Sequence, residues 1–246
     1  SGVLVVAVND ATRALEFLTM DEKEYIAEVI VGMETDTLDV KGAILRQEKK
    51  EISKEQLETV LTSFLGTYEQ EVPKFSAVHV NGKRLYEYAR AQEEVTLPKR
   101  VVTISSISLL ECHQEEEYFV FSFQTTVSKG TYIRSLIRDI GLLLKVPCTM
   151  RSLRRTRQGK FDLSQSKRVE DLEMVALLPI ADALSFPQVV VEDEHLLFQI
   201  KNGAKLPYMT FSGLVSFVDV NHQLLAIYQP DSKGGVKPVR VWSHQK

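Results

Sequence analysis

The sequence has 246 residues, of which 44% are hydrophobic and 26% are charged, and its net charge is −3. A chain of this length and composition folds into one large domain, or into one large and one small domain, rather than remaining disordered. Its apolar runs, such as residues 3–8, are far too short to cross a membrane, and no signal peptide is recognised. Cys112 and Cys148 lie far apart without metal-ligand spacing, so we expect no disulfide framework, no metal site and a cytoplasmic location.

The acidic net charge conceals a basic segment. Between residues 129 and 168 there are eleven lysines and arginines but only two acidic residues, Asp139 and Asp162, which gives this segment a charge of +9. A polyanion responds to local potential and to counterion release, so the segment is compatible with a nucleic-acid partner. A solvated basic face is the alternative interpretation.

In chain order, the first part of the sequence predicts a mixture of strands and helices. Residues 3–8 predict a buried strand, residues 11–18 a short helix behind it, and residues 24–31 a further strand. Ser53 and Gln56 have the spacing of a capping box, which predicts a helix that continues to Phe64 and is stopped at Gly66.

The middle of the chain predicts long strands and one strong helix. Residues 75–80 predict a strand, Asn81-Gly82 a turn, and residues 84–91 a helix. Residues 101–110 and 118–125 predict an antiparallel pair around the acidic turn 115–117, and apolar spacing predicts an amphipathic helix from Ile133 to Leu144. Because no βαβ rhythm is present, we expect an α+β fold with a mixed, largely antiparallel sheet core and flanking helices.

From Pro187 onwards the sequence predicts a small β-rich module. The expected strands are 189–191, 214–220, 223–228 and 239–242, and the expected helix is 194–201. We therefore expect two domains, residues 1–182 and residues 187–246.

Two residues stand out as candidates for chemistry. Arg134 falls in the first turn of the amphipathic helix, where a cation opposes the helix dipole, and this position predicts an anionic partner elsewhere in the fold. An exposed arginine without such a partner is the alternative. Tyr25 lies on a strand whose residues Ile26, Glu28 and Ile30 point the other way, so it is either a core residue or a stacking platform.

Two further segments predict contacts with RNA. Aromatic and basic residues are interleaved between positions 73 and 90, and arginines are crowded between 151 and 159. Unstacked nucleotides are bound by aromatic faces and by positive charge near the phosphates.

Four ordered motifs resemble the TruB family of tRNA pseudouridine synthases. They are Gly32-Met-Glu-Thr-Asp-Thr-Leu-Asp39 with Gly42, Phe75-Ser-Ala77 with Tyr86-Glu-Tyr-Ala-Arg90, Lys129-Gly-Thr-Tyr-Ile-Arg-Ser135, and Leu153-Arg-Arg-Thr156 with Gly159 and Phe161. The order and spacing match over nearly all of the larger part of the chain. The stretch from Pro187 resembles the small PUA-like RNA-binding domain that these enzymes carry.

The resemblance implies an isomerase that uses no metal or organic cofactor. It implies that the T-loop uridine of tRNA (tRNA position 55) is flipped out of the stack, attacked by an aspartate and converted to pseudouridine. In such an enzyme Arg134 holds the aspartate ionised and oriented, Tyr25 stacks on the base, and Thr131, Tyr132 and Leu153 line the pocket. The residues for which RNA contacts are implied are Lys83, Tyr86, Lys129, Arg151, Arg154, Arg155 and Arg157.

The resemblance also places the nucleophile outside residues 1–246. In the family it lies in a Gly-x-Leu-Asp-Pro-x-Ala-Thr/Ser-Gly-Val-Leu stretch, and Ser1-Gly-Val-Leu4 matches the end of that stretch. We therefore expect no turnover by these residues alone, and we expect Asp36 and Asp39 to be loop and capping residues. A bacterial, monomeric protein that binds the tRNA T-arm stem-loop is expected, and a non-catalytic tRNA-binding module is the alternative function.

Overall fold

The computed structural model describes residues 1–115, 117–172 and 177–242, which form two compact units. The first unit consists of Ser1–Leu4 and Asp21–Gln165, and the second consists of Val5–Met20 and the chain from Ser166 onwards. The predicted domain limits, 1–182 and 187–246, are not the limits of these two units, and the division into two domains at those positions stays a prediction.

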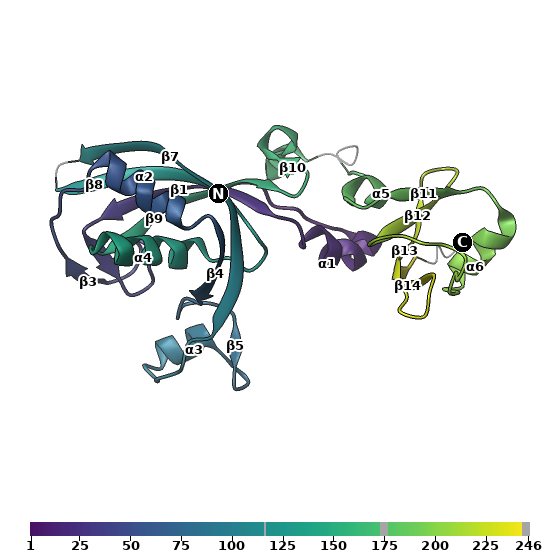
Figure 1. Cartoon of the computed structure of the whole chain (residues 1–246), viewed down its shortest axis with the longest axis horizontal. Helices are drawn as coiled ribbons and strands as arrows, with labels where there is room; N and C mark the ends of the chain where they lie inside the picture. The colour runs from purple at the N-terminus through teal and green to yellow at the C-terminus, as the bar shows by residue number, and fades with distance from the viewer. Residues whose placement is uncertain (116, 173–176, 243–246) are drawn as a thin grey trace. The chain divides into compact units, whose positions relative to one another are not determined.

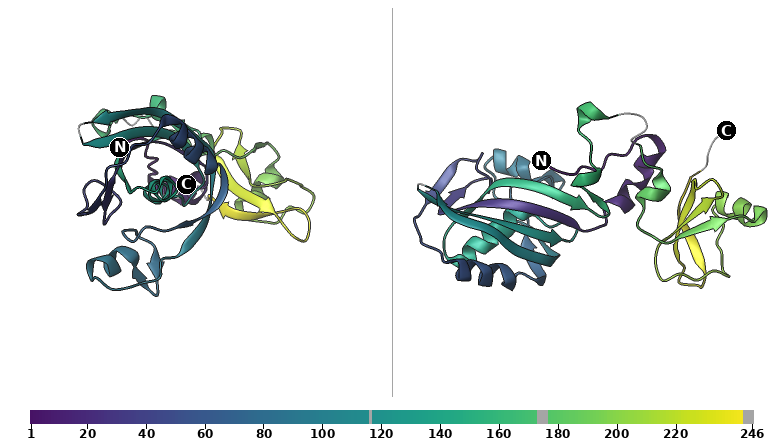
Figure 2. Two further views of the ribbon diagram at one scale, coloured as in Figure 1. Left: turned by 60° about the vertical axis from the view of Figure 1, so that its left-hand side comes forward. Right: turned by 90° about the horizontal axis from the view of Figure 1, so that it is seen from above.

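A six-stranded sheet is the framework of the first unit. Its strands are β1 (Lys23–Val31), β4 (Gly66–Glu71), β7 (Lys99–Glu115), β8 (Tyr118–Val127), β9 (Cys148–Gln158) and β10 (Phe161–Asp162). They lie side by side in the order β10-β9-β1-β8-β7-β4, and each neighbouring pair is antiparallel (Figure 2). The α+β class and the long pair predicted from 101–110 and 118–125 are confirmed.

Two helices, α2 (Lys54–Ser63) and α4 (Ile133–Leu144), pack on one face of this sheet (Figure 1). Alternate residues of β1 point to that face, so Ala27 and Val29 are buried in the same cluster as Leu57 of α2 and Leu136 of α4. This cluster is the core of the first unit and holds the inner face of β1 against the start of α4.

Local signals set the ends of α2. The Ser53 hydroxyl accepts a hydrogen bond from the Gln56 amide at 3.2 Å, and the Gln56 side chain accepts one from the Ser53 amide at 3.0 Å. The predicted capping box is therefore present, and the helix ends shortly before Gly66, whose φ is +98°.

Two short hairpins accompany the main sheet. β2 (Met33–Thr35) pairs with β3 (Ile44–Gln47), and β5 (His79–Val80) pairs with β6 (Lys83–Arg84). The predicted turn at Asn81-Gly82 joins β5 to β6 with φ angles of 51° and 81°. α3 (Leu85–Arg90) follows directly, and Figure 1 shows α3 and β5 beyond the end of β4, away from the six-stranded sheet.

Two predictions about strands were wrong, and β9 was not predicted. Residues 3–8 form no strand: only Val3 is buried among them, and Leu4 and Val6 are each 72% exposed. Within residues 75–80 only β5 is a strand. The segment interpreted only as a basic patch forms β9, which pairs with β1 along its whole length. Buried residues in it are confined to Cys148–Met150 and Gln158, so its sequence carries little apolar signal for a strand.

The second unit is built on a four-stranded sheet. Its strands, in spatial order, are β11 (Gln188–Val191), β12 (Val215–Asp219), β13 (Leu224–Pro230) and β14 (Val236–Val241). β11 and β12 are parallel and the other pairs are antiparallel, while α6 (Glu194–Lys201) packs its Ile200 into the core of this sheet. The predicted β-rich module and its helix are confirmed.

Short helices complete the chain. They are the 3-10 helices η1 (Asn9–Ala14), η2 (Leu163–Gln165) and η3 (Val169–Asp171), and the α-helices α1 (Leu15–Leu18) and α5 (Ile180–Ala183). η1 and α1 correspond to the predicted helix at 11–18, although they belong to the second unit. No helix within the described ranges is long and apolar enough to cross a membrane.

Contacts of the N-terminal segment explain this assignment. The Trp242 indole donates a hydrogen bond to the Asp10 carbonyl at 3.2 Å, and the Arg13 guanidinium lies 5.4 Å from the centroid of the indole ring. Phe17 packs edge-on against Phe186 with ring centroids 5.8 Å apart. Residues 9–18 therefore pack within the second unit and not behind a strand at 3–8.

Candidate active site and RNA-binding surface

The turn before α4 sets the position of Arg134. Gly130 has a φ of +90°, which glycine adopts without steric cost, and Tyr132 is the N-cap of the helix in an extended conformation. Between them the Thr131 hydroxyl donates a hydrogen bond to the Ser128 carbonyl at 2.9 Å. Arg134 therefore lies in the first turn of α4, as predicted.

The Arg134 guanidinium is partly buried and binds two loops. Nη1 donates to the Thr37 carbonyl at 3.0 Å, and Nη2 donates to the Phe75 carbonyl at 2.9 Å. No carboxylate within the described ranges forms an ion pair with it, so the predicted anionic partner is not among those residues. The Ser76 and Ser135 hydroxyls, adjacent in sequence to Phe75 and Arg134, are buried and have no hydrogen-bond partner in the described part of the chain, which is uncommon in folded proteins.

Tyr25 and Leu153 lie on the sheet face that α4 covers. Tyr25 is opposite Arg155 across the β1–β9 pairing and Leu153 is opposite Ala27, so these side chains share one face. Tyr25 and Leu153 are partly buried and pack against the core cluster that contains Ile133, the residue between Tyr132 and Arg134. Tyr25 and Leu153 thus lie on the sheet face that carries α4, whose first turn contains Arg134.

Two segments from elsewhere in the chain run along the outer edge of β9. Residues 1–3 form backbone hydrogen bonds of 2.8 to 3.2 Å with residues 153–155. Residues 38–40 form backbone hydrogen bonds of 3.0 and 3.2 Å with Met150, nearer the start of β9. Both segments run parallel to β9, so the edge beside the candidate pocket is shared by the chain start and by the loop next to Thr37.

A polar network that the sequence analysis did not single out joins β4 to α4. The Tyr68 hydroxyl donates to Asp139 Oδ2 at 3.4 Å, and Arg138 donates to Asp139 Oδ1 at 2.8 and 3.0 Å. Burial raises the pKa of the Tyr68 hydroxyl, and burial also raises the pKa of the Asp139 carboxyl in spite of the opposing charge of Arg138. No local signal in the sequence marks these residues, because the partners come from separate elements.

Lys23 is another residue that the sequence analysis did not assign. It precedes Tyr25 by two positions on β1, and its pKa is lowered first by burial and then by the positive charges of Arg155 and Lys129. Lys23 therefore lies near two other cations, Arg155 and Lys129, and near the carboxylate of Asp21, which raises its pKa.

The predicted RNA-binding strip at 151–157 is divided between the two faces of the sheet. Arg155 shares the inner face with Tyr25, whereas Arg154 and Arg157 pair with β1 residues whose side chains point to the outer face. Arg154 is exposed and forms no ion pair within the described ranges. The structure therefore brings only Arg155 of these three arginines to the candidate pocket.

Two predicted RNA-binding cations form exposed ion pairs. Arg151 Nη1 lies 2.7 Å from a Glu115 oxygen, and Lys83 Nζ lies 2.8 Å from a Glu93 oxygen. Exposed pairs of this kind contribute little to stability, so either cation can exchange its partner for a phosphate at small cost.

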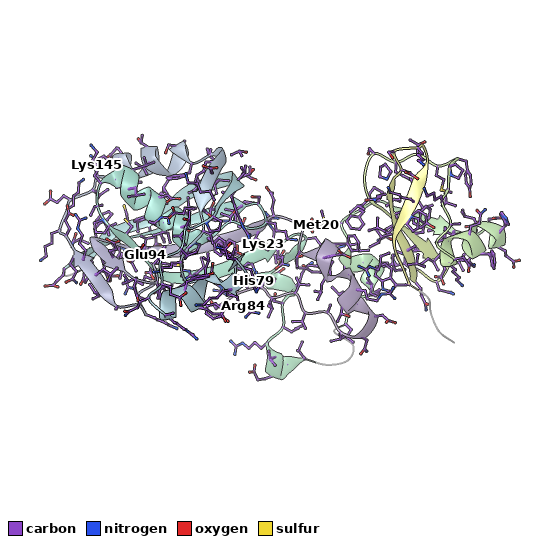
Figure 3. All side chains as sticks on the ribbon, turned by 90° about the horizontal axis from the view of Figure 1, so that it is seen from below. Met20, Lys23, His79, Arg84, Glu94 and Lys145 are labelled. Atoms are coloured by element: carbon purple, nitrogen blue, oxygen red, sulfur yellow. The ribbon has the colours of Figure 1, made fainter. Side chains whose placement is uncertain are left out.

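The hairpin of β5 and β6 and the adjoining α3 gather an aromatic ring between positive charges. The Arg84 and Arg90 guanidinium carbons lie 5.9 and 5.3 Å from the centroid of the Tyr86 ring. Arg84 and His79 are cross-strand neighbours on the hairpin, and both side chains are labelled in Figure 3. A ring flanked by cations suits a stacked nucleotide, which is what the sequence predicts for Tyr86.

Solved structures show which assemblies contain this fold. A crystal structure of a Cbf5–Nop10–Gar1 complex matches with a TM-score of 0.69 and 25% identity, over 98% of this chain and 72% of that chain. A structure of an H/ACA RNP bound to a substrate RNA containing 2′-deoxyuridine matches with a TM-score of 0.67 and 22% identity, over 96% and 71% of the two chains. This chain therefore shares its fold with a protein chain of each of these two assemblies.

Sequence comparison gives the family. The TruB family pseudouridylate synthase N-terminal domain matches residues 1–133, and the tRNA pseudouridylate synthase B C-terminal domain matches residues 134–185. Relatives named tRNA pseudouridine synthase B include those of Bacillus cytotoxicus (38% identical over 98% of this chain and 84% of the relative) and Shouchella clausii (37%, 99% and 85%). The chain belongs to the TruB family of pseudouridylate synthases, a family of isomerases, and the resemblance carried by the four motifs is confirmed.

Proposed function

We propose that the protein converts the T-loop uridine of tRNA to pseudouridine, with an aspartate nucleophile supplied upstream of Ser1. The names of the relatives, tRNA pseudouridine synthase B, support tRNA as the substrate. The observation that carries the proposal is the direction of the chain along the edge of β9.

Residues 1–3 run parallel to β9, so a chain that precedes Ser1 extends towards the start of that strand. The start of β9 is bordered by residues 38–40, next to Thr37, whose carbonyl accepts a hydrogen bond from Arg134. The family motif puts the aspartate four residues before Ser1, a reach of about 14 Å in an extended chain. A carboxylate on this path approaches the Arg134 guanidinium and supplies the anionic partner that its helix position predicts.

The proposed chemistry is an isomerisation without a cofactor. The aspartate attacks the flipped nucleotide, the bond between N1 of the base and C1′ of the ribose breaks, and the released uracil turns in the pocket. A bond from C5 to C1′ then forms while the bond between the aspartate and the sugar breaks. C5 loses its proton and N1 gains one, so the atoms of substrate and product balance. Arg134 keeps the aspartate ionised, Tyr25 stacks on the base with its hydroxyl near the C5 proton, and Thr131, Tyr132 and Leu153 enclose the base.

The RNA contacts follow from the position of each cation. Lys129 and Arg155 are proposed to bind the phosphates nearest the flipped base. The charges of both lower the pKa of Lys23, which lies two residues before Tyr25 on β1. Lys83 and Tyr86 are proposed to bind the stem-loop from the β5–β6 hairpin and α3. Arg151, Arg154 and Arg157 are proposed as outer contacts, on parts of the sheet that do not face the pocket.

Release of tritium from tRNA labelled at uridine C5 tests the proposal. Three proteins are compared: residues 1–246, the same chain extended upstream through the aspartate, and the extended chain with that aspartate changed to asparagine. Release is expected from the unchanged extended chain alone. Release by residues 1–246 would show that the nucleophile lies within them, and tight tRNA binding without release by any of the three would favour a non-catalytic tRNA-binding module.

A further inference from the structure

The side-chain amide of Gln70 is held at three points. Gln70 lies on β4 and is only 1% exposed. Its Oε1 accepts a hydrogen bond from the Tyr132 amide at 2.8 Å, and its Nε2 donates to the Tyr132 carbonyl at 3.2 Å and to the Tyr68 hydroxyl at 2.6 Å. The amide therefore pairs with both backbone groups of Tyr132, as a neighbouring strand would.

Tyr132 depends on Gln70 for the hydrogen bond of its own backbone N–H. It is the N-cap of α4, and it forms no side-chain capping hydrogen bond. A backbone N–H that is removed from water needs an acceptor, and Gln70 provides one through its side chain. The place where α4 begins is thus tied to Gln70, and Arg134 lies two residues further along the helix.

The other side-chain hydrogen bonds and ion pairs between the described residues of β4 and α4 lie beyond the first turn of the helix. The Tyr68 hydroxyl bonds to Asp139 at 3.4 Å, and Glu71 lies 3.0 Å from Arg138, both further along the helix. Of the described residues of β4, Gln70 alone forms a hydrogen bond with Tyr132, the N-cap of α4.

We propose that Gln70 is a positioning residue for the candidate active site. By holding the backbone of Tyr132, it sets the place and direction of the Arg134 guanidinium and the wall of the base pocket at Tyr132. Gln70 itself touches neither the RNA nor the nucleophile. The kinetic part of this inference rests on the proposed function, because the orientation of Arg134 affects turnover only if the site is an active site.

Three variants separate positioning from general stability. Gln70→Leu keeps the approximate size and removes all three hydrogen bonds, and Gln70→Glu keeps an acceptor for the Tyr132 amide but, when ionised, has no donor for the Tyr132 carbonyl. Thr149→Val is the matched control, because it removes a hydrogen bond of 2.7 Å from a fully buried side chain to the Met33 carbonyl, away from the start of α4.

Steady-state kinetics are measured in the extended chain. Gln70→Leu is expected to lower kcat roughly tenfold to 100-fold, with little change in KM for tRNA, because a small displacement of an active-site group slows the reaction while the exposed cations still bind the RNA. Gln70→Glu is expected to be partly active. Its kcat, relative to that of the unmodified protein, is expected to rise as the pH is lowered, because a protonated carboxyl can again donate a hydrogen bond. A wild-type kcat in Gln70→Leu, or an equal loss in Thr149→Val, overturns the inference.

Amide hydrogen exchange at Tyr132, measured on residues 1–246, tests the contact without relying on turnover. Exchange is expected to be roughly five- to tenfold faster in Gln70→Leu, the effect of losing one hydrogen bond, and unchanged in Thr149→Val. Unchanged exchange in Gln70→Leu overturns the inference. If Gln70→Leu does not fold, Gln70→Glu decides through its kcat and its pH dependence. Faster exchange in a protein whose extended form makes no pseudouridine would refute the proposed function and leave the contact established.

Discussion

At the scale of single residues, the position of Arg134 depends on partners that are remote in sequence. Its guanidinium binds the carbonyl of Thr37, 97 residues away, and that of Phe75, 59 residues away. Each carbonyl belongs to a different family motif, so one side chain joins the β2–β3 region, the segment before β5 and the first turn of α4. Arginine suits this task because its planar group carries several donors in a fixed geometry.

Arg134→Lys should therefore abolish most of the activity although it keeps the charge. A lysine ammonium is a point charge that cannot reproduce the two-carbonyl geometry, and turnover by the extended chain should fall roughly 100-fold. Affinity for tRNA should be preserved, because the exposed cations supply it. Single-turnover rates and filter binding measure the two quantities, and Arg46→Lys, on exposed β3, is the control. Near-normal turnover in Arg134→Lys would contradict the assigned role.

Asp139 should make stability depend on pH. Its pKa in the folded protein is raised above the ordinary value of 3.8, chiefly by burial. A raised pKa favours the folded state below the ordinary pKa, and that contribution is lost as the pH rises through the folded-state value. The unfolding free energy of the unmodified protein relative to Asp139→Asn should therefore decrease from about pH 4 to about pH 7. Urea titrations at both pH values measure it, and a difference that is constant or grows with pH would contradict this account.

At the scale of elements, the predictable parts are those that depend on local signals. Three such signals are the Ser53 and Gln56 capping box, the Asn81-Gly82 turn and the apolar spacing of α4. Each involves residues that are close together in the sequence, and the structure has all three. β9 was not predicted because its place in the sheet comes from pairing with β1, more than a hundred residues earlier, and its own composition is mostly polar and basic.

The candidate site was predictable to a similar extent. The family resemblance led to Tyr25, Arg134 and Leu153, and the fold places Tyr25 and Leu153 on the sheet face that carries α4, the helix of Arg134. Gln70 could not have been found in this way, because a glutamine in a polar strand carries no signal and its role comes from a partner 62 residues away. Apolar composition was misleading at residues 3–8, where the chain follows the edge of β9 only as far as Val3.

The capping box of α2 gives a prediction at this scale. Ser53→Ala removes the acceptor for the Gln56 amide and should lower the free energy of unfolding of the first unit by about 1 kcal/mol. Thr59→Ala is the control. The exposed Thr59 hydroxyl donates a hydrogen bond to the Glu55 carbonyl of the same helix, and its removal should leave stability nearly unchanged. Chemical denaturation followed by circular dichroism measures both, and equal effects would contradict the capping argument.

At the scale of the whole molecule, the two units have separate cores. The first core joins β1, β8, α2 and α4, and the second joins the four-stranded sheet with α6. Units with their own cores can unfold separately, so a mutation in one should leave the transition of the other in place. The chain supplies a convenient reporter, because its single tryptophan, Trp242, is 1% exposed and belongs to the second unit.

Phe17 tests to which unit the N-terminal segment contributes stability. It is 5% exposed and packs against Phe186, so Phe17→Ala should destabilise the second unit by about 3 kcal/mol and lower the denaturant midpoint seen by Trp242 fluorescence. Leu57→Ala, in the fully buried position on α2, should have the opposite pattern: a loss of about 2 to 5 kcal/mol in the first unit and an unchanged fluorescence midpoint. If Phe17→Ala left the fluorescence transition in place and shifted the transition of the first unit instead, residues 9–18 would contribute their stability to the first unit, and the assignment to the second unit would be wrong.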